Sequence, residues 1–372
     1  MRKKTIRTLT IKGFKSIREL KEFKLQSLNV LIGANGAGKS NFVSFFKMLG
    51  ELVEGRLQAW TLKQGGADRL LSFGIKETNA IDISIRFGEY EYEVTLEPTA
   101  AGGFVFSNEQ TYSYFDGFDL FHGLSKPWLG SGHLESRLKQ EIEDMISMNI
   151  ASYCYDAISS WKVFHFHDTS DTAGVKRLGA LHDCSYLRSD ASNLAAYLFH
   201  LKQNHPETYS QIRKNVALAI PFFDDFVLKP ISLPSGEQQI RLLWKQKDSD
   251  YALWPSQLSD GSLRFICLVT ALMQPNPPST IIIDEPELGL HPYALVLLGA
   301  LIRAAAKRMQ VIVSTQSVPL LNEFSISDLI IVEREKGVST FKRLNQKDFK
   351  NWLEDYSVGE LWEKNVLGGR PN

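Results

Sequence analysis

A glycine-rich octapeptide, Gly33-Ala-Asn-Gly-Ala-Gly-Lys-Ser40, constrains the possible folds of this chain more than any other feature. It fits the pattern G-x-x-x-x-G-K-[ST] and lies between an apolar, strand-like run (residues 28–32) and a helical pattern that begins at Asn41. Glycines let successive backbone N–H groups turn toward phosphate oxygens, and the following helix adds the positive end of its dipole. The octapeptide therefore predicts a phosphate-binding loop between a strand and a helix.

The residue types in this loop suggest individual roles. We expect the Lys39 ammonium to reach the β- and γ-phosphates of a nucleotide and the Ser40 hydroxyl to ligate Mg²⁺. The predicted nucleotide-binding residues are the members of the loop and the residue that follows it: Gly33, Ala34, Asn35, Gly36, Ala37, Gly38, Lys39, Ser40 and Asn41.

An acidic pair ends a second apolar run. Residues 280–283 read Thr-Ile-Ile-Ile, and Asp284 and Glu285 follow directly. Because the carboxyl ends of parallel strands line the ligand crevice, Asp284 is predicted to hold Mg²⁺ through water. Glu285 is predicted to polarise an attacking water, the base role in phosphoryl transfer. Without the phosphate loop, a solvated acidic turn after a core strand is the competing interpretation.

Composition places the chain among ordinary globular proteins. It has 372 residues, 44% of them hydrophobic, and its 42 basic residues balance 42 acidic ones, which excludes a uniformly basic nucleic-acid coat and an acidic tail. The three cysteines are scattered without metal-ligand spacing, which favours thiols in a reducing compartment. No apolar run reaches about 18 residues and no signal peptide is visible, so we expect a cytoplasmic protein without membrane contact.

Hydrophobic periodicity predicts an α/β chain. Strands are expected at residues 5–12, in a hairpin at 79–96, after Gly102-Gly103, at 161–166 and as a pair within 226–244. Helical patterns cover residues 134–158, 193–201 and 206–220. After Pro255 helices and strands alternate, which argues for a parallel sheet with helices on its faces. We interpret the chain as one nucleotide-binding core interrupted by an insertion.

Three further segments complete an ordered set of motifs: Leu258-Ser-Asp-Gly-Ser-Leu-Arg264, Leu288-Gly-Leu-His-Pro292 and Ser314-Thr-Gln-Ser317. With the phosphate loop and the acidic pair, they resemble ABC-type ATPase heads, especially the SMC/RecF/OLD-like branch, and the resemblance implies that the three segments are, in this order, the signature, the D-loop and the switch. In that family a signature motif precedes the acidic strand by about two dozen residues. Here Gly261 precedes Asp284 by 23 positions.

The resemblance spans essentially the whole chain. It is similar to small bacterial predicted AAA/ABC-type ATPases of the RecF/OLD-like group. The additional matching segments identify a relative without assigning it a task; they are Ile11-Lys-Gly-Phe-Lys-Ser, Gly65-Gly-Ala-Asp, His165-Phe-His-Asp-Thr-Ser, Ser192-Asn-Leu-Ala-Ala and Gly359-Glu-Leu-Trp-Glu-Lys-Asn-Val-Leu-Gly-Gly-Arg-Pro.

The resemblance implies the fold of a P-loop NTPase of the α/β class. This is an ABC-ATPase head with a mostly parallel core sheet, an antiparallel β lobe and an inserted helical lobe. The 218 positions from Ser40 to Leu258 contain no run of three or more heptads, so no coiled-coil arms are expected. We expect a single head over 1–372, in which 1–130 forms the phosphate-loop and antiparallel β lobe. Residues 131–255 are expected to form the helical lobe, with a core strand near 161–166, and 256–372 the lobe of the signature, Walker B, D-loop and switch.

The resemblance also implies a catalytic site shared between two subunits. ATP is expected to be sandwiched between two heads, with the phosphate loop and Asp284 of one subunit holding the phosphates and Mg²⁺. Ser259 and Gly261 of the other subunit are expected to cap the γ-phosphate. An ATP-dependent homodimer is the expected assembly, and a higher oligomer stays open.

The predicted catalytic residues are Glu285, Lys39 and Gln316. Gln316 stands at the switch position, where the family usually has histidine. This departure leaves nucleotide binding intact and puts γ-phosphate sensing and the turnover rate in question.

The turn after residue 166 lies where related heads place the Q-loop glutamine, which contacts Mg²⁺ and the attacking water. His167 or Asp168 is the favoured substitute, with Asp168 as a metal ligand, and Gln64 is the other candidate. His165 and His167 share one face of a strand, so an H-x-H metal site is an alternative. The segment shows no third ligand, which favours ordinary hydrogen-bonded residues at a strand end.

The first 24 residues are rich in positive charge, with nine basic side chains against Glu19 and Glu22. They could form a rim that contacts the phosphates of double-stranded DNA, or a solvated strand face. Neither interpretation is preferred. The basic residues are Arg2, Lys3, Lys4, Arg7, Lys12, Lys15, Arg18, Lys21 and Lys24.

Two functions of different classes follow. The first is an ATP-gated, dimerising ATPase that acts on or near DNA, with anti-phage defence beside a separate effector such as a nuclease as its setting, since OLD-like relatives pair this head with nuclease domains. No acidic D-x-D cluster follows the head, so the chain is not expected to cut DNA itself. The second is an ATP-loaded scaffold that holds a toxin or effector inactive and hydrolyses slowly or not at all. A small-molecule kinase leaves the Leu258–Arg264 match unexplained.

Overall fold

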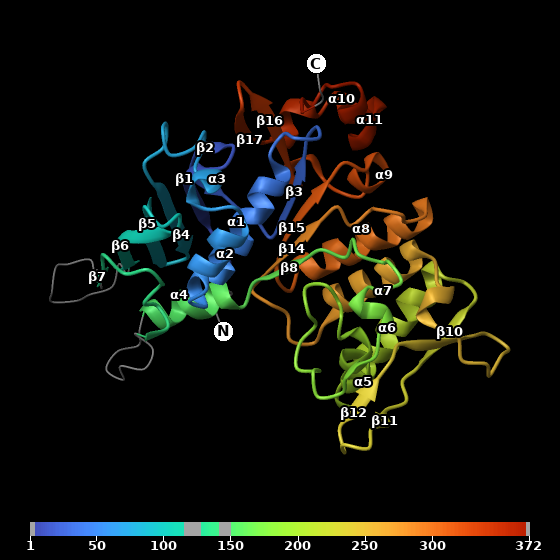
Figure 1. Ribbon diagram of the computed structural model, residues 1–372. Helices are drawn as coiled ribbons and strands as arrows, with labels where there is room; N and C mark the ends of the chain where they lie inside the picture. Colours follow the sequence, from blue (N-terminus) through green and yellow to red (C-terminus); the bar gives the residue numbers. More distant parts are fainter. Residues whose placement is uncertain (1–3, 115–127, 141–149, 370–372) are drawn as a thin grey trace.

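A six-stranded core sheet forms the centre of the molecule. The computed structural model describes residues 4–114, 128–140 and 150–369 (Figure 1). The strand order is β17-β16-β3-β15-β14-β8, and all neighbours are parallel except β17, which runs antiparallel to β16. The strands are β3 (Leu28–Ile32), β8 (Lys162–Phe164), β14 (Thr280–Asp284), β15 (Gln310–Thr315), β16 (Leu329–Glu335) and β17 (Val338–Arg343).

A second, antiparallel six-stranded sheet has the order β2-β1-β4-β5-β6-β7. Burial alternates along β4, with every isoleucine and phenylalanine inside, because successive side chains point to opposite faces. Its strands are β1 (Thr8–Phe14), β2 (Ile17–Lys24), β4 (Ile81–Phe87), β5 (Tyr90–Pro98), β6 (Phe104–Ser113) and β7 (Trp128–Gly130). Four helices contribute buried side chains to the same hydrophobic cluster as this sheet: α1 (Lys39–Val53), α2 (Leu57–Lys63), α3 (Ala67–Leu70) and α4 (Ile150–Ser159).

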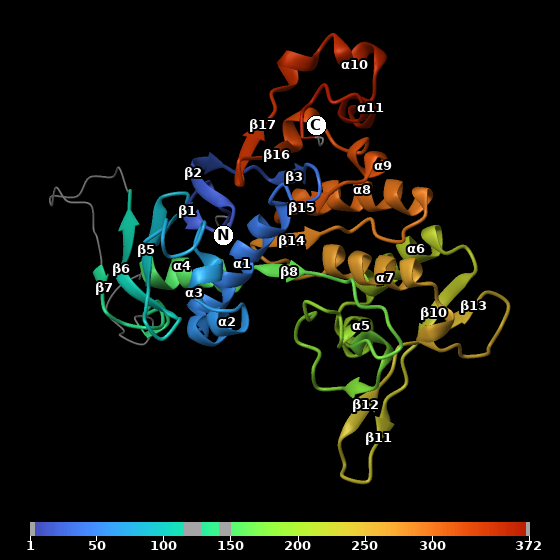
Figure 2. The same ribbon diagram turned by 45° about the horizontal axis from the view of Figure 1, so that its top comes forward.

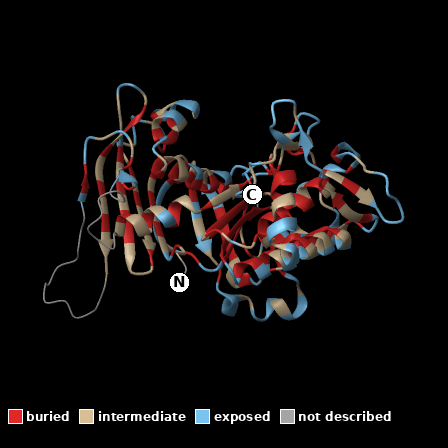
Figure 3. Cartoon of the chain, turned by 90° about the horizontal axis from the view of Figure 1, so that it is seen from below, coloured by how far each residue is buried: buried red, intermediate tan, exposed pale blue. Residues whose placement is uncertain are grey.

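The core sheet separates two hydrophobic clusters because both of its faces are covered. Along β14, Ile281 and Ile283 belong to the cluster shared with the helical part of the chain, whereas Ile282 belongs to the cluster shared with α1 and the antiparallel sheet. Strands β3, β14 and β15 are buried along their whole length, as expected for parallel strands covered on both sides (Figure 3).

A helical layer covers the other face of the core sheet, and small strands extend from it (Figure 2). It contains α5 (Leu194–Asn204), α6 (Pro206–Ala219), α7 (Asp260–Met273) and α8 (Pro292–Ala306). The small strands are β9 (Gly179–Ala180), β10 (Phe223–Val227), β11 (Ile231–Ser232), β12 (Gln238–Ile240) and β13 (Leu243–Gln246). The chain ends with α9 (Val318–Leu321), α10 (Trp352–Asp355) and α11 (Val358–Glu363).

The predicted fold class is confirmed: the chain is α/β, with a mostly parallel core sheet, an antiparallel β lobe and a helical lobe. In the described part of the chain the longest helices, α1 and α8, have 15 residues, so no coiled-coil arm is present there. None of the described helices combines the length and the apolar character that crossing a membrane requires.

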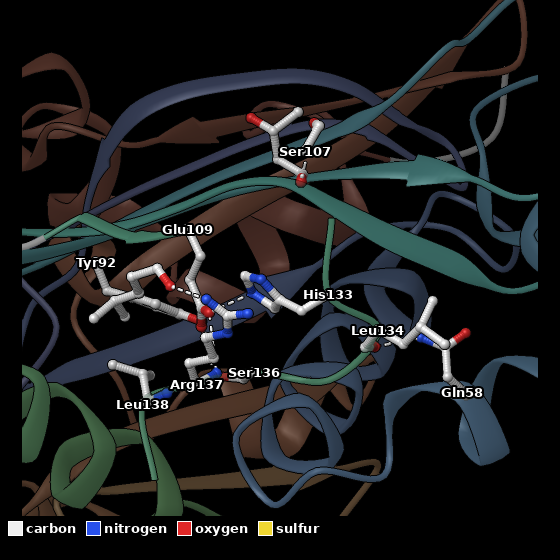
Figure 4. Close-up of polar contacts among 11 residues, drawn as sticks. Gln58, Tyr92, Ser107, Glu109, His133, Leu134, Ser136, Arg137 and Leu138 are labelled. Atoms are coloured by element: carbon white, nitrogen blue, oxygen red, sulfur yellow. Dashed lines mark hydrogen bonds and ion pairs between the residues drawn. The ribbon is translucent and has the colours of Figure 1, made fainter. Parts of the chain in front are cut away.

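The helical pattern predicted for residues 134–158 is only partly correct. Helix α4 begins at Ile150, residues 134–139 form bends and turns, and 141–149 lie outside the described residues. The side chain of buried Glu109 on β6 accounts for the difference, because its carboxylate binds residues 133–137 and holds them in a non-helical conformation (Figure 4). It accepts hydrogen bonds from Ser136 Oγ at 2.5 Å and from the backbone N–H of Arg137 at 3.0 Å, and His133 Nε2 lies at 2.8 Å.

Two further differences concern β2 and β17, which the sequence patterns did not indicate. Both are edge strands with mostly exposed or half-buried residues, so their hydrophobic alternation is weak.

Helix α4 packs away from the helical lobe: Ala151, Cys154 and Ile158 lie in the cluster of the antiparallel sheet. We therefore propose that the inserted helical lobe starts after β8 rather than at residue 131.

Candidate functional site

The phosphate loop has the backbone geometry of a nucleotide cradle. Gly36 and Gly38 have φ values of 77° and 118°, which side-chain-bearing residues rarely adopt. A Cβ on Gly33 would lie 2.1 Å from the carbonyl oxygen of Val332, so only glycine fits against β16 there. Lys39 Nζ donates to the carbonyl oxygens of Gly33 (2.6 Å) and Ala34 (3.1 Å), and its burial lowers its pKa, an effect that nearby carboxylates oppose.

Two buried serines from outside the motif support the loop. Ser339 on β17 donates to the carbonyl oxygen of Ala37 at 2.6 Å, and its hydroxyl lies 2.7 Å from that of Ser16. Ser16 also accepts from Asn41 Nδ2 at 2.6 Å. A Cβ on Gly38 would lie 2.0 Å from Ser339 Oγ, so the loop and β17 are in close contact. Asn41 therefore supports the loop from its first helical turn.

The predicted acidic pair ends β14 as expected. Asp284 is 8% exposed, and its Oδ1 has no hydrogen-bond partner in the protein. A buried carboxylate oxygen without a donor fits a cation ligand, and the exposed Ser40 hydroxyl at the start of α1 supplies the type of second oxygen that Mg²⁺ prefers. Glu285 has a φ of 46°, an uncommon backbone conformation, and its N–H donates to the Ser314 carbonyl at 2.8 Å.

Gln316 connects the phosphate loop with the acidic pair. Its Nε2 donates to Asn35 Oδ1 at 2.6 Å and to Glu285 Oε1 at 3.4 Å. Its backbone N–H donates to Glu287 Oε1 at 2.8 Å, and burial raises the pKa of Glu287. Three motifs that are far apart in the sequence therefore meet through one amide side chain.

The signature segment contacts the D-loop of the same chain. Ser259 is the N-cap of α7: it is exposed, and its Oγ accepts from the Ser262 N–H at 3.1 Å. A Cβ on Gly261 would lie 2.0 Å from the carbonyl oxygen of Gly289. Arg264 donates to the carbonyl oxygens of Leu288 at 3.0 Å and of Phe166 and His167 at 2.9 Å. These bonds tie the signature, the D-loop and the turn after β8 together.

The turn after β8 places histidines, rather than Asp168, beside Asp284. The rings of His165 and His167 stack at 3.7 Å; His165 Nδ1 lies 3.9 Å from Asp284 Oδ2 and His167 Nε2 lies 3.4 Å from the Asp284 carbonyl oxygen. Asp168 is exposed, and hydrogen bonds from Ser170 lower its pKa. Gln64 caps the C-terminus of α2 in the β lobe.

We therefore propose His167, rather than Asp168 or Gln64, as the Q-loop substitute. The geometry gives the H-x-H alternative no support, since no group of three or more His, Cys, Asp or Glu side chains that could hold a metal ion occurs among the described residues.

The basic N-terminal side chains do not form a uniform positive surface. Lys4 pairs with Asp156 at 2.8 Å, Lys12 lies 3.5 Å from Glu19, and Lys15 Nζ donates to Ser44. Arg7, Arg18, Lys21 and Lys24 are exposed, and Arg2 and Lys3 lie outside the described residues. The geometry favours a solvated strand face for the part of the rim that the structure describes.

Ser16, Ser339 and Glu287 are residues at the candidate site that sequence reasoning missed. Ser16 ends the segment Ile11-Lys-Gly-Phe-Lys-Ser, so that match was the one available signal. Ser339 lies on an edge strand without a motif, and only the tertiary structure brings it to the loop.

Comparisons with known proteins agree with the fold. Residues 159–322 match a family described as "AAA domain, putative AbiEii toxin, Type IV TA system". The fold is similar to an SMC head solved with the C-winged helix domain of ScpA bound (16% identity, 93% of this chain and 99% of that chain covered, TM-score 0.60). It is also similar to an SMC head with an extended coiled coil, bound to the C-terminal domain of ScpA from Pyrococcus furiosus (17%, 94% and 99%, 0.55). No curated protein sequence matches.

The chain has the fold of these SMC heads, and the order of its motifs resembles that of ABC-type ATPase heads. The family match begins at residue 159 and ends at residue 322, so it covers less than half of the chain and includes neither the phosphate loop nor the C-terminal strands β16 and β17.

Proposed function

We propose that this chain binds ATP with Mg²⁺ and hydrolyses it to ADP and phosphate in an ATP-dependent homodimer. The observation that carries the proposal is the meeting of Asn35 in the phosphate loop, Glu285 after β14 and Gln316 after β15 through hydrogen bonds. Ser40 and Asp284 are the proposed Mg²⁺ ligands, and the ion, when bound, neutralises charge on the transferring phosphoryl group. Glu285 accepts the proton of the attacking water.

The dimer is proposed because the signature is not part of the phosphate site in one chain. The Ser259 side chain stays in the first turn of α7, where it bonds to Ser262, and Gly261 packs on the D-loop. Exposed Ser259 is free to face a γ-phosphate held by a second copy. The Ser259 hydroxyl of one subunit, facing the γ-phosphate held by the other, would complete the site only when ATP is bound.

The proposed setting is a defence process with a separate effector. The matching family carries a toxin–antitoxin description, and the two similar SMC heads were solved with a protein partner bound. A nuclease or toxin is the proposed partner, and double-stranded DNA is a second one that turnover measurements can test.

An ATP-loaded scaffold is the alternative, and one observation favours it. Gln316 Nε2 donates to Asn35 Oδ1 and to Glu285 Oε1, so both amide hydrogens of the switch residue are bound within the chain rather than directed at a γ-phosphate. Slow turnover is the expected consequence, and the protein would then act chiefly through its ATP-bound form.

Single-turnover hydrolysis combined with size measurement separates the two functions, using the wild type and Glu285→Gln. If the protein is an ATPase, we expect the wild type to hydrolyse ATP and Glu285→Gln to accumulate as an ATP-bound dimer. Hydrolysis by neither protein would support the scaffold. Monomers that persist with saturating ATP would refute the shared site, and a turnover rate that does not respond to duplex DNA would remove DNA as a partner.

A further inference from the structure

The C-terminal segment 357–369 forms a compact unit that the catalytic scheme does not use. Its helix α11 starts with a capping box, in which Ser357 Oγ accepts from the Glu360 N–H and Glu360 Oε2 accepts from the Ser357 N–H at 2.7 Å. Leu361 and Leu367 are 0% and 5% exposed and belong to the main hydrophobic cluster. The segment is therefore an integral part of the fold.

Helix α11 packs on α9, which begins directly after the switch residue Gln316 and its neighbour Ser317. The Gly359 N–H donates to Asn322 Oδ1 at 2.7 Å. A Cβ on Gly359 would lie 2.7 Å from the same oxygen and 2.9 Å from the Val318 carbonyl oxygen, so the two helices are in backbone contact at this point. The position of α11 therefore depends on the helix that follows the switch.

The chain then leaves α11 and reaches the start of the phosphate loop. Gly368 and Gly369 both have a φ of 84°, and the Gly369 N–H donates to Glu333 Oε1 at 2.8 Å. A Cβ on Gly369 would lie 3.5 Å from Gly33 Cα and 3.0 Å from Ile331 Cγ2. Gly369 thus lies beside Gly33 and against residues Ile331 and Glu333 of β16.

We propose that the C-terminal segment 357–369 is a positioning clasp that joins the helix after the switch to Gly33 of the phosphate loop, with Glu333 and Gly369 as its positioning residues. The inference rests on the proposed function, because it assigns these residues to ATP binding and turnover. Gly33 is a sensitive point for such a contact, since its carbonyl oxygen accepts one of the two hydrogen bonds that hold Lys39.

The clasp acts by limiting the freedom of the loop. A phosphate loop binds its ligand through backbone N–H groups, so each alternative backbone conformation of Gly33 reduces the fraction of molecules that are ready to bind. Loosening the tail is expected to lower ATP affinity, and because α11 contacts α9, to lower turnover at saturating ATP as well. A merely structural tail would change the melting temperature without these effects.

The test compares Gly369→Ala with the matched control Gly236→Ala. Both glycines have a left-handed φ (84° and 86°), so alanine strains the backbone equally, but nothing lies within 4 Å of a Cβ on Gly236, in the β11–β12 turn. Glu333→Ala removes the acceptor for the Gly369 N–H, whereas Glu333→Gln keeps an acceptor oxygen. ATP affinity by calorimetry, single-turnover rate and hydrogen exchange of residues 33–39 without nucleotide are measured for each protein.

The expected result is an ATP Kd about tenfold higher and faster exchange of the loop amides in Gly369→Ala and Glu333→Ala, with Gly236→Ala and Glu333→Gln like the wild type. Equal affinity, turnover and exchange in Gly369→Ala and Gly236→Ala would overturn the clasp. If Gly369→Ala does not fold, the comparison of Glu333→Ala with Glu333→Gln tests the clasp by the same three measurements, and equal results for these two variants would overturn it. If the wild type binds no ATP, the proposed function fails, and hydrogen exchange alone supports or overturns the clasp.

Discussion

Gly261→Ala is the substitution that most directly tests the contact between the signature and the D-loop. The new methyl group would lie 2.0 Å from the carbonyl oxygen of Gly289 and 2.9 Å from its carbonyl carbon, where real Cβ atoms do not come closer than about 3.0 Å. The obstacle is backbone on both sides, so no side chain can rotate away. The start of α7 and the D-loop must therefore separate by about 1 Å.

This shift is expected to lower both the free energy of unfolding and the rate of hydrolysis. Overpacking of this kind costs about 1–3 kcal/mol of folding free energy. The D-loop follows Glu285 directly along the chain, and a displacement of about 1 Å at a catalytic group can cost about 100-fold in rate. Within one chain the neighbours of a Cβ on Gly261 belong to the D-loop, so the Kd for ATP bound to the monomer should stay within about twofold of the wild type.

The assay is a set of three measurements on Gly261→Ala: thermal unfolding, ATP affinity and single-turnover hydrolysis. Gly50→Ala is the matched control, because Gly50 also lies in a helix and nothing is within 4 Å of its Cβ. We expect Gly50→Ala to bind and hydrolyse ATP like the wild type. A Gly261→Ala protein with wild-type melting temperature and turnover would refute the reasoning.

Three further substitutions test other parts of the structure. Glu109→Ala leaves the buried Tyr92 hydroxyl and Ser136 without their acceptor, so we expect a loss of about 3 kcal/mol in the free energy of unfolding by denaturant; a loss below about 1 kcal/mol would contradict it. Burial raises the pKa of Glu287, so its neutral carboxyl group favours the folded state below the unfolded pKa, and this benefit disappears as the pH rises through the folded pKa and the group ionises. Glu287→Gln should therefore raise the melting temperature at pH 8 and not at pH 4, and a gain that does not change with pH would disprove the burial argument. Gln316→Ala should lower single-turnover hydrolysis about 10- to 100-fold with unchanged ATP affinity, and wild-type turnover would exclude Gln316 as the switch.

The buried strands and helices of the core could be predicted from the sequence because their signals are local. The strand at residues 28–32 and the helices after Pro206 and Pro292 have strong hydrophobic patterns, and the structure places them there. Edge strand β17 has one fully buried side chain, Ser339, and that residue is polar. Periodicity cannot find such a strand, because pairing with β16 rather than burial of an apolar face defines it.

The residues of the candidate site also fall into those that the sequence could predict and those that it could not. Spacing located the phosphate loop, the acidic pair and Gln316, since each motif keeps its residues close together in the sequence. Spacing could not choose among His167, Asp168 and Gln64. In the structure their surroundings differ: Asp168 accepts from Ser170 at the surface, while His167 lies against Asp284, which is why we propose His167.

The sequence alone determined that this chain builds a phosphate loop and an acidic strand end in the order of an ABC-type ATPase head. A short motif encodes its own backbone geometry, through glycines and the helix that follows. Only the tertiary structure decided which distant residues hold that geometry: Ser339 behind the loop, Arg264 across the D-loop and the Gly368–Gly369 tail against Gly33. Such contacts arise from the packing of whole elements, and nothing in the local sequence of either partner specifies the other.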